Sequence, residues 1–198
     1  MKVFLESDRL ILRQFVANDL DNLFDLNSDS EVMRYINGGL PTSYHDIEKS
    51  LSKYLESYEK NAYLGFWAAI EKTNNKFIGW FHFLTTTNFN YLAEFNLVTG
   101  DEIALGYRLR RASWHKGFAT EGSGAIIAKG FSELGVTKVV SWALIENKAS
   151  IRVMEKAGLK WKKEFYFSEN QLPNLLVSER KAAIYGLSKD EFIAKYNN

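Results

Sequence analysis

The residues best placed to do chemistry form a short turn at positions 116–120 (KGFAT). An apolar, strand-like run at residues 103–107 leads towards this turn, and a helical pattern that ends at Gly135 follows it. The first turn of a helix carries backbone N–H groups without intrahelical acceptors, and the helix dipole adds partial positive charge. Gly117 lets a ligand approach the backbone closely, and Ala119 adds little bulk. The stretch therefore predicts an anion site.

A plainer interpretation of the same turn is that Gly117 only relieves backbone strain between a strand and a helix. The chain lacks the Gly-x-x-x-x-Gly-Lys-Ser/Thr phosphate loop and the Gly-x-Gly-x-x-Gly dinucleotide pattern, which disfavours an ATP or NAD site. Arg110, Arg111 and Lys116 place three cations nearby, and these either support the anion site or are simply solvated.

A second group of polar residues follows residues 138–144 (KVVSWAL), which are typical of a strand. Asn147 precedes an expected helix at 148–157 that Gly158 terminates. Ser150 lies one helical turn beyond Asn147, so both side chains can face one ligand. The alternative is that Asn147 only caps the helix and Ser150 completes the cap.

The length, charge and composition of the chain limit the classes of protein to which it can belong. A chain of 198 residues with net charge +1 fits one domain over 1–198 and gives no sign of a nucleic-acid binder. The absence of cysteine excludes disulfides and thiolate chemistry, and it is compatible with a reducing compartment. The N-terminal residues lack the apolar core of a signal peptide, and no apolar run reaches the length that spans a membrane. We therefore expect a cytoplasmic protein with no membrane partner.

The elements that must position these groups begin with an expected strand at residues 9–15. Asn18 or Asp19 is expected to cap a short helix, and Ser43 is expected to open a second one. Residues 86–101 are expected to form a long loop or an extended hairpin end. The other expected elements are strands at 65–71, 77–85, 159–167 and 179–185, and a last helix that Ser188 caps.

This order of elements predicts an α+β or mixed α/β fold, with helices on both faces of a mostly antiparallel sheet. The connection from the strand at 103–107 through the long helix to the strand at 138–144 is long enough for a right-handed parallel crossover.

Taken together, the motifs resemble the GNAT superfamily of acyl-CoA-dependent N-acetyltransferases, and most closely its branch of ribosomal-protein-alanine N-acetyltransferases (RimJ/RimL-like). The resemblance spans nearly the whole chain. It is carried by residues 7–13 (SDRLILR), 78–79 (IG), 105–109 (LGYRL), 114–121 (WHKGFATE), and Asn147 with 149–158 (ASIRVMEKAG). It implies the acyl-CoA N-acyltransferase fold, in which one parallel pair of strands in a twisted sheet splays apart.

The resemblance also implies the identity of the anion, which is the pyrophosphate of coenzyme A. Backbone N–H groups of the turn would hold it, and Lys156 would reach the outer phosphate. The pantetheine arm would pair with the strand at 103–109 and accept a hydrogen bond from Asn147. The implied cofactor-binding residues are Leu105, Tyr107, Leu109, Trp114, His115, Lys116, Gly117, Phe118, Ala119, Thr120, Asn147 and Ser150.

The implied chemistry is direct attack of an amine on the thioester of acetyl-CoA in a ternary complex. A backbone N–H near Tyr107 would stabilise the oxyanion, and Ser150 would protonate the leaving thiolate. In this branch a glutamate commonly stands at the position of Ala104. Glu102 lies on the same face of the strand and is the substitute candidate for the base, the alternative being a solvated carboxylate. Tyr185 is a weaker candidate for the acid.

Other residues suggest no further chemistry. The three histidines have no spacing typical of metal ligands, and His82 is better suited to the core or a pocket wall than to a base. No metal is therefore expected.

The acceptor is left open between a protein N-terminus, a polyamine and an amino sugar, with residues 35–63 and 86–101 lining its site. A monomer and a homodimer are both compatible with the sequence. A non-catalytic acyl-CoA-binding module and a fold relative with another small phosphate ligand are the alternatives.

Overall fold

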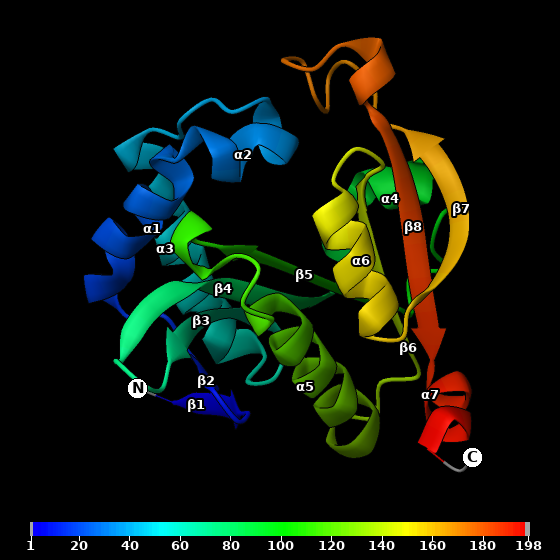
Figure 1. The fold of residues 1–198 in the computed structure, drawn as a ribbon, viewed down its shortest axis with the longest axis horizontal. Coiled ribbons are helices and arrows are strands. Elements are labelled where there is room, and N and C mark those ends of the chain that lie inside the picture. Colours follow the sequence, from blue (N-terminus) through cyan, green and yellow to red (C-terminus); the bar gives the residue numbers. More distant parts are fainter. Residues whose placement is uncertain (1, 197–198) are drawn as a thin grey trace.

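The computed structural model describes residues 2–196 and contains an eight-stranded sheet in the order β1-β2-β3-β4-β5-β6-β8-β7 (Figure 1). Neighbouring strands run antiparallel except for β5 and β6, which are parallel. The strands are β1 (Val3–Glu6), β2 (Leu10–Arg13), β3 (Gly65–Glu71), β4 (Lys76–Thr85), β5 (Ile103–Leu109), β6 (Lys138–Leu144), β7 (Lys160–Tyr166) and β8 (Lys181–Ser188).

Seven α-helices accompany the sheet within residues 2–196. They are α1 (Leu20–Ser28), α2 (Ser30–Asn37), α3 (Tyr44–Lys60), α4 (Asn90–Glu94), α5 (Phe118–Glu133), α6 (Lys148–Lys156) and α7 (Lys189–Tyr196). Short 3-10 turns lie at Ala17–Asp19, Thr86–Asn88, Arg111–Ser113 and Val177–Glu179. No helix in this range is long and apolar enough to cross a membrane.

Helices cover both faces of the sheet, which explains why β3 and β4 are apolar almost throughout. On one face α5 packs Ile126 and Ile127 against Phe81, and all three are fully buried. A Cβ on Gly122 of α5 would lie 2.3 Å from the Phe81 ring, so only glycine allows this approach. On the other face α1 and α3 cover the side chains that alternate with these, including Trp80. The predicted mixed fold with helices on both faces is confirmed.

The parallel pair is joined only at its beginning. Ile103 pairs with Val139 and Ala104 with Val140, and the pairing of β5 with β6 stops there. Beyond Ala104 the strands separate, because β6 keeps its full ladder with β8 while β5 keeps its ladder with β4. The edge of β5 from Leu105 onwards therefore faces a gap, as predicted for a splayed pair.

Two expectations about the residues before α1 are corrected. The strand expected at 9–15 is β2, and it pairs with β1, which was missed because it is a four-residue edge strand that is only partly buried. Asp19 precedes α1 but does not cap it. Its buried carboxylate accepts hydrogen bonds from Arg13 Nη1 at 2.6 Å, Arg13 Nη2 at 2.8 Å and the Val16 N–H at 2.9 Å.

The other elements lie close to where they were expected. Ser43 caps α3 by accepting from the Asp46 N–H at 3.2 Å, and Ser188 accepts from the Glu191 N–H at the start of α7. The segment expected to be a loop at 86–101 contains a 3-10 turn and α4, whose five residues give too short a pattern to recognise. β8 extends three residues beyond the expected end, to Ser188.

Candidate active site

The N-terminal end of α5 is open to solvent. Gly117 is the N-cap residue with φ +84°, and no side chain caps the helix. The first intrahelical bond runs from the Glu121 N–H to the Gly117 carbonyl at 3.0 Å, so the N–H groups of residues 118–120 precede the helical ladder. A Cβ on Gly117 would meet only Nη2 of Arg9, at 3.2 Å. These features fit an anion site whose walls are backbone.

An ion pair with Arg9, which lies in the bend before β2, fixes this turn in place. Glu121 accepts hydrogen bonds from Ser7 Oγ at 2.7 Å, the Arg9 N–H at 2.8 Å and Arg9 Nε at 2.7 Å. Arg9 also donates to the Lys116 carbonyl at 2.9 Å, and its guanidinium lies 4.7 Å from the centre of the Phe118 ring. Burial raises the pKa of Glu121, but the hydrogen bonds from Ser7 and Arg9 outweigh it and hold this pKa below the ordinary value. The one carboxylate in the first turn of α5 is thereby neutralised by Arg9 and does not oppose a bound anion.

A cavity of about 700 Å³ runs from this turn to the gap beside β5. Its walls come from β5, the turn, α6 and α2. The predicted residues that line it are Tyr107, Leu109, Trp114, His115, Gly117, Phe118, Ala119, Thr120, Asn147 and Ser150. The structure therefore brings the two polar groups of the sequence to one site. Helix α2 also lines the cavity: Tyr35 and Ile36 belong to the segment 35–63 that was expected to line the acceptor site, whereas Glu31 and Val32 were not predicted.

Two of the predicted cofactor-binding residues do not line the cavity. Leu105 points into the core between the sheet and α5, where it is 4% exposed. The side chain of Lys116 is exposed, and its carbonyl is occupied by Arg9. Leu105 can therefore contact a ligand only through its main chain.

A pair of hydroxyl groups lies in the gap between the splayed strands. Tyr107 Oη and Ser150 Oγ are 3.2 Å apart, and either group can donate. Burial raises the pKa of Tyr107, against a smaller lowering by the hydrogen bond with Ser150, so the phenol stays protonated. Asn147 caps α6 by accepting from the Ser150 N–H at 3.1 Å, which leaves its amide N–H₂ free of that bond. The arrangement can donate a proton to an anion that forms in the gap.

Glu102 occupies a different environment. Its carboxylate is 1% exposed and accepts hydrogen bonds from Lys138 Nζ at 2.7 Å, the Thr99 N–H at 2.9 Å and the Gly100 N–H at 3.1 Å. Burial raises its pKa, but the Lys138 and Thr99 hydrogen bonds lower it more, and the result is below the ordinary value. Glu102 does not line the cavity, so its role as the base stays a prediction.

The face of β5 that carries Ala104 and Gly106 is covered by the ring of His82. A Cβ on Gly106 would lie 2.2 Å from Nε2 of His82, which requires glycine at this position. Burial lowers the pKa of His82 to about 3, against a hydrogen bond with the Ala104 backbone that raises it, so the imidazole is neutral at physiological pH. His82 is buried among aromatic rings, which is the core position expected for it. Among residues 2–196, no three potential ligands gather to hold a metal.

Two of the cations expected near the turn, Arg110 and Arg111, pair with carboxylates outside the cavity. Arg110 pairs with Asp25 and Arg111 with Asp29, each at 3.4 Å, so both bind the α1–α2 region and neither lines the cavity. On the opposite wall, α6 brings three further cations to the cavity, and none of them forms an ion pair with a described side chain. These are Lys148, Arg152 and Lys156, all exposed.

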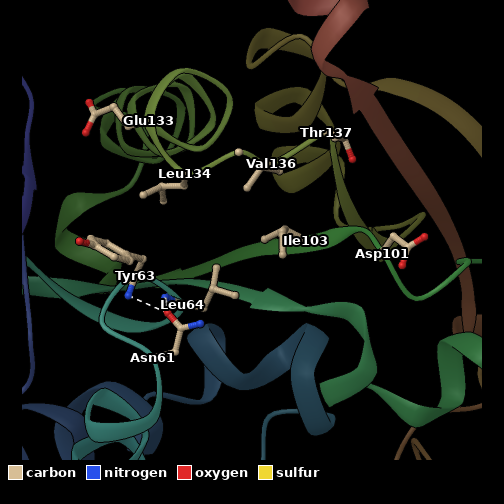
Figure 2. A pocket seen from close by; sticks show the side chains of 10 residues that line it. Asn61, Tyr63, Leu64, Asp101, Ile103, Glu133, Leu134, Val136 and Thr137 are labelled. Carbon is tan, nitrogen blue, oxygen red and sulfur yellow. Dashed lines mark hydrogen bonds between the residues drawn. The ribbon is translucent and has the colours of Figure 1, made fainter.

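A second cavity, of about 500 Å³, lies at the other end of α5. Figure 2 shows it between the end of that helix, near Glu133, and the start of β5 at Ile103. Asn61 holds one wall by accepting from the N–H groups of Tyr63 and Leu64 at 2.8 and 2.9 Å. Asp101 and Glu133 add negative charge to the negative end of the helix dipole, so this cavity does not suit a phosphate.

Comparisons with known proteins agree with this geometry. A family model described as an acetyltransferase (GNAT) domain matches residues 9–160. YoaA of Bacillus subtilis (strain 168), named as an uncharacterized N-acetyltransferase, is 30% identical over 159 residues, which cover 79% of this chain and 82% of YoaA.

Two solved structures share the fold. A GNAT-family acetyltransferase from Bacillus anthracis has a TM-score of 0.75 at 23% identity, and the match covers 94% of this chain and 99% of that one. RimL, a ribosomal L7/L12 α-N-protein acetyltransferase solved with coenzyme A, has a TM-score of 0.75 at 14% identity, covering 96% and 99%. With the family model matching most of its length, this chain belongs to the GNAT family of acetyltransferases.

Proposed function

We propose that this acetyltransferase moves an acetyl group from acetyl-CoA to a primary amine by direct attack in a ternary complex. The observation that carries the proposal is a single cavity that joins the uncapped N-terminus of α5, the free edge of β5 and the Tyr107–Ser150 hydroxyl pair. A phosphate group, an extended amide chain and a leaving thiolate each find one of these three features suited to them.

In this proposal, acetyl-CoA is bound mainly by main-chain groups. The N–H groups of residues 115–120 hold the pyrophosphate, and Lys156, joined by Lys148 and Arg152, neutralises the outer phosphate. The edge of β5 from Leu105 to Leu109 takes the pantetheine arm as an additional strand, since its pairing with β6 stops at Ala104. The Asn147 amide, already oriented by its cap, donates to the same arm.

The chemical half uses the hydroxyl pair. Acetyl-CoA supplies an activated acyl group, and the amine nitrogen attacks its carbonyl carbon. A backbone N–H of β5 near Tyr107 stabilises the oxyanion. The C–S bond then breaks, and Ser150, supported by Tyr107, protonates the thiolate. The nitrogen loses its proton to water or to a base, for which Glu102 is the candidate from the sequence.

Thermal unfolding with acetyl-CoA and a thiol-release assay across amines test the proposal. Ligand at a hundredfold excess over its Kd should stabilise the protein by about 2.7 kcal/mol, and thiol release should require an added amine. A protein that neither gains stability nor releases thiol would refute both halves.

The RimJ/RimL-like branch predicts an α-amine, such as a protein N-terminus, among the acceptors. A second candidate function, a non-catalytic acyl-CoA-binding module, is favoured by Ala104, where a glutamate base commonly stands in this branch. It predicts the same stabilisation by acetyl-CoA, but no thiol release with any amine.

A further inference from the structure

The guanidinium of Arg108 forms no ion pair with a described carboxylate. Arg108 lies on β5 beside Tyr107, and its guanidinium stacks 5.1 Å from the centre of the Trp80 ring. Nη1 donates to Asn27 Oδ1 on α1, while Nε is buried and has no hydrogen-bond partner. No carboxylate of residues 2–196 lies within 4.0 Å of it.

Two arginines of residues 2–196 are more deeply buried than Arg108, and both are compensated. Arg13 pairs with Asp19. Arg180 has no carboxylate either, but its Nε donates to two main-chain carbonyls, those of Leu172 and Leu175. Burial lowers the pKa of Arg108 only to about 10, so it remains charged at neutral pH. Taking a charge out of water without a partner is costly, which suggests that a ligand supplies the partner of Arg108.

The position of Arg108 connects this charge to the site. Arg108 lines the cavity that also contains Tyr107 and Ser150. Successive side chains of a strand point to opposite faces, and here Tyr107 packs near Phe81 on the α5 face while Arg108 lies against Trp80 on the α1 face. The cation is therefore next to the proposed reaction site, on the face away from the hydroxyl pair.

We propose that the acceptor is a primary amine that carries a carboxylate, and that Arg108, held by Asn27 and Trp80, binds this carboxylate. The inference rests on the proposed function and specifies its acceptor. The guanidinium presents several N–H donors in a planar fork that matches a carboxylate. The same charge disfavours polyamines, whose remaining ammonium groups it would repel.

The reaction then forms an N-acetylated amino acid. The amine nitrogen bonds to the acetyl carbon, the thioester C–S bond breaks, the nitrogen loses a proton and the thiolate of coenzyme A gains one. The carboxylate takes no part in bond making and only positions the amine.

The test compares ω-amino acids with n-alkylamines of the same chain length in the thiol-release assay, since the two series differ in the carboxylate. The wild-type protein should prefer the amino acids by at least about tenfold in kcat/KM. Arg108→Met should remove this preference by raising KM for the amino acids about tenfold to a hundredfold, and should change kcat/KM for the alkylamines much less. Arg108→Lys keeps the charge without the fork and should retain part of the preference.

The matched control is Arg110→Met, because Arg110 also stacks on a ring, that of Phe77 at 5.4 Å, but pairs with Asp25 outside the cavity. It should keep the wild-type preference. Acetyl-CoA binding and thermal unfolding of each variant distinguish lost recognition from lost folding.

Three results would overturn the inference while the proposed function stands: equal turnover of both series by the wild-type protein, better turnover of spermidine than of any amino acid, or a proportional loss for both series in Arg108→Met. A wild-type protein that does not bind acetyl-CoA would overturn the proposed function itself, and the acceptor assignment with it.

Discussion

Replacement of Glu102 by glutamine separates two roles for this carboxylate, a proton acceptor in the reaction and an anchor of the turn before β5. Glutamine keeps the shape and one acceptor oxygen. Its N–H₂ group, however, must face either the Lys138 ammonium or the N–H groups of Thr99 and Gly100, which are all donors. The substitution therefore removes one charge and turns at least one hydrogen bond into a contact between donors.

The magnitude follows from burial. Hydrogen bonds to charged groups contribute about 1.5–3 kcal/mol each, and breaking a fully buried pair costs about 3–5 kcal/mol. The Lys138 side chain is 41% exposed and can return to water, so we expect a loss of about 2 kcal/mol. For a protein of this size that loss lowers the melting temperature by about 4–8 °C.

Thermal unfolding as a function of pH gives a second signature. The pKa of Glu102 in the folded protein lies below the ordinary value of 4.5, so its stabilisation is complete above that pH and is lost as the pH falls through the folded pKa. The difference in melting temperature between wild type and Glu102→Gln should be constant above about pH 5 and shrink below about pH 4. Glu133→Gln, at an exposed i,i+4 pair with Lys129, is the control and should change little.

The rate decides between the two roles. If Glu102 is an anchor, Glu102→Gln should keep the pH dependence of kcat when measured well below its melting temperature. A variant with wild-type stability and a rate that no longer falls at low pH would refute the structural role and identify Glu102 as the base.

Three further predictions concern the site and its surroundings. Gly117→Glu should abolish acetyl-CoA binding in a titration. Gly117→Ala carries the same positive-φ strain of about 1–2 kcal/mol but should still bind acetyl-CoA. Equal loss of binding in both variants would show that backbone strain, and not the added charge, is responsible. Ser150→Ala should lower kcat by about tenfold to a hundredfold with an unchanged Kd for acetyl-CoA, and a parallel loss of binding would reduce Ser150 to a pantetheine contact. The imidazole of His82 has a pKa of about 3 in the folded protein and near 6.5 in the unfolded chain. The free energy of unfolding should therefore fall by up to about 1.4 kcal/mol per pH unit as the pH drops below 6.5. His82→Gln should flatten that slope in thermal unfolding, and an unchanged slope would contradict the assignment.

Local signals explain what could be predicted from the sequence. Gly117 and Asn147 were recognisable because turn and cap chemistry depends on a few consecutive residues. The same holds for the bounds of β3 and β6, whose apolar runs end at polar turns. The splay between β5 and β6 followed from the resemblance and could not have been derived from the periodicity of either strand.

Long-range pairing explains what was missed. The Arg9–Glu121 pair that holds the turn at 116–120 joins residues 112 positions apart, so no spacing rule detects it. That Glu102 shares a strand face with Ala104 stays a prediction, because Glu102 directly precedes β5. Its chemistry, however, is set by the turn at Thr99–Gly100 and by Lys138, and these partners meet only when β5 lies beside β6. Arg108 looked like one of several basic residues until the fold left it without a carboxylate.

The most direct test of the central claim is release of coenzyme A thiol from acetyl-CoA by the wild-type protein and by Gly117→Glu, with and without a primary amine. The account predicts release by the wild-type protein that rises and saturates with the amine, negligible release without it, and none by the variant. Acetyl-CoA binding without amine-dependent release would contradict the enzyme assignment, and equal release by the variant would contradict the role of the α5 turn.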